Sequence, residues 1–153
     1  MLPLVAGMNL LAQDTVIQTL PPITVTATTK KLPEKVWKNF RDYFENATDP
    51  KWYEMNKSYL AEFMMDNKDN HALFNKKGKL IYHISYGYEN SLPEDLRNQV
   101  KASYGDYNIT RAIKVNEANR TIWVVNVEDA KNLIMVRLEN GEMEEVKRYE
   151  KAG

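Results

Sequence analysis

The sequence predicts an α+β fold, in which two tandem helix-plus-four-strand repeats form an antiparallel sheet of about eight strands with both helices on one face. Two observations lead to this prediction. Leu32-Pro33-Glu34 recurs sixty residues later as Leu92-Pro93-Glu94, and each copy opens a segment with apolar residues at helical spacing. After each segment the apolar period changes from 3.6 to 2, which is typical of strands. We therefore expect a first repeat over 32–91 and a second over 92–151, together one structural domain.

The first twelve residues form an apolar run that ends in Leu10-Leu11-Ala12. Such a run before a small residue is typical of a secretory signal, and we expect export to the periplasm or medium with cleavage near Ala12. No Lys or Arg precedes the run, so the basic part of a signal is missing and the true start codon is open. The alternative is a buried N-terminal strand or helix.

Residues 13–31 are rich in Thr and Pro, which indicates an extended linker or edge strand. Within them, residues 20–27 are similar to the N-terminal extension of TonB-dependent receptors, in which a short Thr/Val segment is captured by strand addition. The alternative is a plain tether.

Each repeat begins with an amphipathic helix. In the first, the apolar face carries Val36, Trp37, Phe40, Tyr43, Phe44 and Ala47, and in the second the equivalent face carries Leu96, Val100, Ser103 and Tyr104. We expect the core to rest on Trp37, Phe40, Phe44, Tyr59 and Phe63.

Alternation along the strands assigns side chains to the two faces of the sheet, with turns over 66–70 and 75–78. The set expected to meet the helices is Tyr59, Ala61, Phe63, Leu80, Tyr82, Ile84 and Tyr86. In the second repeat we expect strands over 107–115, 121–128, 132–138 and 142–149, and either face can take Trp123, Val125 and Val127.

The face away from the helices is unusually apolar for a one-sided sheet, which indicates a contact surface. The residues predicted to bind there are Leu60, Glu62, Met64, Ile81, His83 and Trp123. The alternative is that another layer, the N-terminal segment or a second copy of the chain, covers this face.

Composition limits the chemistry. The 153 residues carry 21 basic and 21 acidic side chains with no basic stripe, so nucleic acid is not an expected partner. There is no Cys, and the two histidines lack a metal-binding spacing. His71 and His83 in neighbouring strands could hold a metal with Glu62 or Asp69, but we expect ordinary sheet positions, no metal and no cofactor. No nucleophile or phosphate-binding motif is present, so we expect no catalysis.

The first repeat also carries a set of residues beyond simple periodicity. They are Leu32-Pro33-Glu34, Asn46-Ala47-Thr48, Lys51-Trp52, Tyr59, Ala61-Glu62-Phe63 and Lys77-Gly78-Lys79-Leu80. This pattern resembles the PepSY-like family of small exported bacterial proteins, whose fold is like that of β-lactamase inhibitor protein. The second repeat lacks the Asn-Ala-Thr and Lys-Trp parts of the pattern.

The resemblance implies an exported, non-enzymatic binding or inhibitor-like module that docks a protein or peptide on the sheet face. The alternative function is a cell-envelope interaction module that uses its N-terminal segment for strand addition. The apolar run is too short to span a membrane, and the sequence leaves the oligomeric state open.

Overall fold

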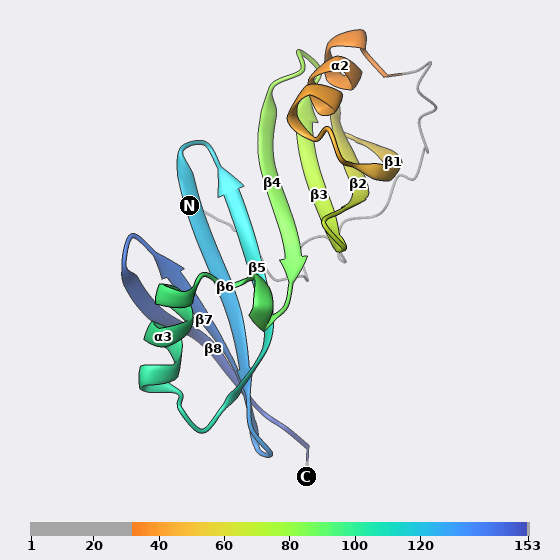
Figure 1. Cartoon of the computed structure of the whole chain (residues 1–153). Coiled ribbons are helices and arrows are strands. Elements are labelled where there is room, and N and C mark those ends of the chain that lie inside the picture. The colour runs from red at the N-terminus through yellow and green to blue at the C-terminus, as the bar shows by residue number, and fades with distance from the viewer. Residues whose placement is uncertain (1–31, 153) are drawn as a thin grey trace.

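The computed structural model describes residues 32–152, so the predicted signal-like segment and linker lie outside the described residues. The elements follow in the order α2 (Glu34–Tyr43), β1 (Thr48–Met55), β2 (Ser58–Met65), β3 (Lys68–Asn75), β4 (Leu80–Gly87), a 3-10 turn η1 (Glu89–Ser91), α3 (Glu94–Ser103), β5 (Asn108–Glu117), β6 (Arg120–Glu128), β7 (Asn132–Glu139) and β8 (Glu142–Glu150). All eight strands form one antiparallel sheet in chain order, with α2 beside the first four strands and α3 beside the last four (Figure 1). The predicted fold class is confirmed.

The two helices form for the same local reasons. Each follows the proline of a Leu-Pro-Glu sequence, where the missing N–H costs nothing, and each places a glutamate in the first turn near the positive end of the helix dipole. In α2, Val36 and Phe40 lie one turn apart and are buried, and Phe44 closes the helix by donating its N–H to the Phe40 carbonyl. In α3, Val100 is buried in the same way.

Short hairpins set the strand register. Asn56-Lys57 and Asp66-Asn67 have positive φ at both residues, as two-residue turns of the mirror-image type require. Met65 pairs with Lys68 across the second of these turns. The five-residue turn predicted over 66–70 is therefore wrong, because strand β3 already begins at Lys68.

Two hydrophobic clusters form the core, one under each helix. The first consists of Leu32, Val36, Phe40, Phe44, Trp52, Ala61, Phe63, Ala72 and Phe74, and the second of Leu92, Val100, Ile109, Ala112, Trp123, Val125, Val127, Ile134, Val136 and Leu138. Of the five predicted core residues, Phe40, Phe44 and Phe63 are buried, and Trp37 and Tyr59 are partly buried against the first cluster.

The pairing of β4 with β5 joins the two halves into one surface. Gly87 pairs with Ala112 of the second core cluster. His83, which contacts Phe44 at the C-terminal cap of α2, pairs with Asn116 of the same strand β5. Ala112 and Asn116 are four residues apart and share a face. Both helices therefore cover the same side of the sheet, and the other side forms what we call the open face.

Candidate docking face

An apolar belt crosses the centre of the open face. Cross-strand pairs place its side chains in continuous rows, such as Tyr86 with Ile113 and Ile113 with Val124. Its members are Leu60, Leu73, Tyr82, Ile84, Tyr86, Ile113, Val115, Ile122 and Val124. Leu60 is buried, and the others are half-buried.

This belt is unlike the outer face of an ordinary one-sided sheet, which alternates with the core and is mostly polar. Tyrosine is the one titratable residue type among the members of the belt, and Tyr82 is neutral at neutral pH. Burial, with a smaller contribution from the Glu117 carboxylate, raises the pKa of Tyr82 to about 12. The belt is therefore an uncharged strip over β2 to β6, of the kind that marks contact sites on protein surfaces.

A carboxylate-histidine cluster lies on the open face at the first-repeat end of the belt. Glu62 and His71 are direct cross-strand partners on β2 and β3, and Asp69 lies two residues before His71 on the same face. The distance between His71 Nε2 and Glu62 Oε2 is 3.7 Å. Burial lowers the pKa of His71, although the neighbouring carboxylates act in the opposite direction.

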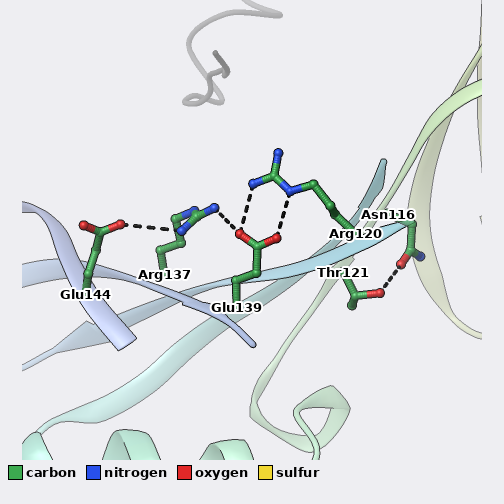
Figure 2. Close-up of polar contacts among 6 residues, drawn as sticks. All are labelled: Asn116, Arg120, Thr121, Arg137, Glu139 and Glu144. Carbon is green, nitrogen blue, oxygen red and sulfur yellow. Dashed lines mark hydrogen bonds and ion pairs between the residues drawn. The ribbon is translucent and has the colours of Figure 1, made fainter. Parts of the chain in front are cut away.

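An arginine-glutamate ladder lies at the other end, over β6, β7 and β8 (Figure 2). Arg120 donates to both carboxylate oxygens of Glu139, with Nε to Oε2 at 2.8 Å and Nη2 to Oε1 at 2.9 Å. Arg137 bonds the same carboxylate and reaches Glu144, with Nη1 to Oε1 at 3.5 Å. The Arg120 hydrogen bonds lower the pKa of Glu139, with a smaller contribution from Arg137. The two arginines and two glutamates balance one another, so the ladder itself carries no net charge.

Three of the predicted binding residues lie on the open face. Leu60, Glu62 and Met64 alternate with Ala61 and Phe63, which belong to the first core cluster. Met64 is 41% exposed, whereas Leu60 is buried between its strand neighbours. A role in binding stays a prediction for all three.

The predicted position of His83 on the open face is wrong. A β-bulge between β3 and β4 pairs Phe74 with Leu80 but Leu73 with Tyr82, so Ile81 has no partner in the register. The bulge shifts the pleat by one residue and turns His83 toward the helices. Its ring lies 4.7 Å from that of Phe44.

The same shift corrects the faces of the aromatic and aliphatic residues on β4. Tyr82, Ile84 and Tyr86 were expected to meet the helices, but they pair with Leu73, His71 and Asp69 and lie on the open face. Their apolar character does not predict which face they occupy, because both alternating sets of this strand contain large side chains. Periodicity assigns these three residues to the core, whereas the bulge places them in the belt.

Trp123 also lies on the helix-covered face, so its predicted place in the binding surface is wrong. It is 8% exposed in the second core cluster, and its strand neighbours Ile122 and Val124 occupy the open face instead.

Sequence reasoning missed the arginine-glutamate ladder. The signal that was available is the spacing of Arg137 and Glu139, since opposite charges two residues apart on a strand share a face.

His83 belongs to a hydrogen-bonded group on the helix-covered face, centred on the buried Asn70. Asn70 Oδ1 accepts hydrogen bonds from His83 Nε2 at 2.9 Å and from Ser85 Oγ at 2.8 Å, and its amide donates to the carbonyls of Met65 and Lys68. Because Asn70 Oδ1 only accepts, His83 Nε2 carries the hydrogen and has no lone pair for Ser85. Burial, helped by the nearby Lys114 charge, lowers the pKa of His83 to about 4. The group is a satisfied structural network and not an activated serine.

Comparisons with solved structures identify bacterial chains that share this architecture. The chain superposes with a TM-score of 0.62 on a BLIP-like protein from Bacteroides fragilis, at 18% identity over 78% of this chain and 86% of that chain. A DUF2874 family protein from Bacteroides uniformis gives a TM-score of 0.60 at 16% identity, covering 77% of this chain and 88% of that one. The similarity to β-lactamase inhibitor protein is thus confirmed at the level of the fold.

Another solved chain, from Bacteroides eggerthii, is described with a provisional assignment to the periplasm and matches at 15% identity with a TM-score of 0.60, over 78% of this chain and 88% of that chain. No protein-family model and no curated protein matches the sequence. Neither helix within residues 32–152 has the length and apolar character needed to cross a bilayer.

Proposed function

We propose that this chain is an exported, non-catalytic module that docks a protein or peptide on the open face, in a binding or inhibitor-like role. The observation that carries the proposal is the apolar belt, which a sheet with helices on only one side does not otherwise need. The fold similarity to a BLIP-like protein and to a chain assigned provisionally to the periplasm supports an exported module of this kind. The PepSY-like resemblance of the first repeat supports the same role.

The chemistry of the open face specifies the kind of partner. The belt is uncharged and the arginine-glutamate ladder is internally neutral, so the part of a partner that meets them presents an apolar strip and little net charge. Docking should then depend weakly on ionic strength, because few charges are screened when salt is added. A partner that dissociates steeply between low and moderate salt would point to a different surface.

The test compares capture from an envelope extract of the native host by the wild type and a double variant of the belt, Ile84→Ser with Val124→Ser. A matched control is Val146→Ser, because Val146 is 53% exposed on β8 and lies outside the belt. Circular dichroism confirms that each variant is folded. The proposal predicts that the same partner is captured by the wild type and the control but is lost with the double variant.

A chain lacking residues 14–29 separates the open face from the alternative function by strand addition. If docking uses the open face, this deletion leaves capture unchanged. Undiminished capture by the folded double variant, with loss on deletion of 14–29, would overturn the proposal and favour strand addition.

A further inference from the structure

The carboxylate-histidine cluster on the open face has the composition and spacing of a metal site. Glu62, Asp69 and His71 each offer one ligand atom, and these atoms all lie within 4.8 Å of one another. Two atoms that bind one Zn²⁺ at about 2.0 to 2.2 Å lie no more than about 4.4 Å apart. Small side-chain rotations, without a change of fold, would therefore bring the three atoms around a single ion.

The sheet fixes the three residues before any ion arrives. Glu62 faces His71 across the β2–β3 pair, and the tight turn at Asp66-Asn67 holds this register a few residues away. The belt continues directly from His71, which pairs with Ile84 on β4. Ligands on rigid, paired strands lose little conformational freedom on binding, which favours a preorganised site.

The orientation of the His71 imidazole decides which of its two ring nitrogens can bind an ion. Its Nε2 faces the carboxylates, at 3.7 Å from Glu62, while Nδ1 is buried without a hydrogen-bond partner. Because no acceptor holds an Nδ1 hydrogen and fixes the tautomer, we expect micromolar rather than nanomolar affinity.

Unlike the two glutamates of the arginine-glutamate ladder, Glu62 and Asp69 have no ion pair with a lysine or arginine side chain in the described part of the chain. Among residues 32–152, no Lys or Arg nitrogen forms an ion pair with Glu62 or Asp69. On the same face, Glu139 and Glu144 are matched by two arginines (Figure 2). Lys51 lies opposite Glu62 across the β1–β2 pair without forming an ion pair, so the carboxylates of the cluster remain available to attract a divalent cation.

We propose that Glu62, Asp69 and His71 bind one divalent transition-metal ion, with Zn²⁺ the preferred ion. One imidazole nitrogen and two carboxylate oxygens suit Zn²⁺, whereas Ca²⁺ takes six to eight oxygen ligands and Mg²⁺ keeps most of its water. Three protein ligands leave a fourth position of a tetrahedral site for water or an incoming group. This proposal stands on the cluster alone and does not depend on docking.

The test is isothermal titration of the full chain with Zn²⁺, and with Mg²⁺ and Ca²⁺ for comparison. We use the isosteric variants Glu62→Gln and Asp69→Asn, with Glu144→Gln as the matched control from the ladder. The proposal predicts one Zn²⁺ per chain, at least tenfold weaker binding in each cluster variant, about 1.4 kcal/mol, and unchanged binding in the control.

Nitrogen-15 NMR of the imidazole rings gives a second readout that does not depend on affinity. The chain has only two histidines, so the signals of His71 and His83 are separable with one His83→Gln variant. The proposal predicts that Zn²⁺ shifts Nε2 of His71 and leaves His83 unchanged. Zn²⁺ binding that is equal in wild type and both cluster variants, a response at His83 alone, or no binding at millimolar Zn²⁺ would overturn it.

Discussion

Phe40 joins the helix to the aromatic side chains of the first hydrophobic core. Its side chain is 3% exposed, and its ring centroid lies between 5.0 and 6.4 Å from the rings of five aromatic neighbours. Replacing a buried Phe by Ala costs about 3 to 5 kcal/mol, which includes the cavity left behind. Aromatic pairs add about 0.5 to 1.5 kcal/mol each beyond their burial, so we expect Phe40→Ala at the upper end, about 4 to 5 kcal/mol.

The assay is urea unfolding followed by far-ultraviolet circular dichroism. The matched control is Tyr43→Ala, an aromatic residue of the same helix that is 60% exposed, for which we expect less than about 1 kcal/mol. If Phe40→Ala is too unstable to measure, Phe40→Leu should still lower the free energy of unfolding by about 1 to 2 kcal/mol. A loss for Phe40→Ala no larger than for the control, with an unchanged denaturant slope, would refute this view of the core.

Two further predictions follow from a backbone position and from a buried histidine. Gly78→Ala should destabilise the chain by about 1 to 3 kcal/mol more than Gly141→Ala in the same unfolding assay, because both have positive φ but only at Gly78 would the added Cβ meet Asn39 Nδ2 at 2.8 Å. The folded-state pKa of His83 is about 4, below its ordinary value of 6.5, so the unfolded state takes up the proton first. Between these two pH values the free energy of unfolding should fall as the pH falls. The expected loss is about 1 to 2 kcal/mol, because the His83 ring keeps partial contact with solvent. The variant His83→Gln should flatten this pH dependence.

Local patterns were enough to predict the architecture. The repeated Leu-Pro-Glu starts and the helical spacing of Phe40 and Phe44 gave the helices, and alternation at Ala61 and Phe63 gave the core face of β2. These features depend on residues close in sequence, whose geometry is set by the helix and strand periods.

The pleat of β4 and the face of Trp123 were not predictable in this way. Leu80, Ile81 and Tyr82 are all large and apolar, so a one-residue bulge changes no pattern in the sequence while it moves every later side chain to the other face. In β6, large apolar residues occur in both alternating sets, Trp123 in one and Ile122 and Val124 in the other, and Trp123 belongs to the core under α3. Such choices depend on contacts between distant segments.

The carboxylate-histidine cluster shows a similar limit. The spacing of Asp69 and His71 is visible in the sequence, but their approach to Glu62 depends on the length of the intervening turn. A five-residue turn over 66–70 gives a different register from the two-residue turn at Asp66-Asn67. The sequence favoured ordinary sheet positions over a metal site, because the meeting of Glu62, Asp69 and His71 depends on the register and His83 lies on the other face.

Site-specific photo-crosslinking in the native host tests the central claim, that the open face docks a partner, most directly. A photoreactive phenylalanine analogue is placed at Met64, which is 41% exposed on the open face, or at Tyr43, which is 60% exposed on α2. We expect a discrete crosslinked protein or peptide from position 64 and none from position 43. Crosslinking from position 43 alone, or from neither position, would contradict it.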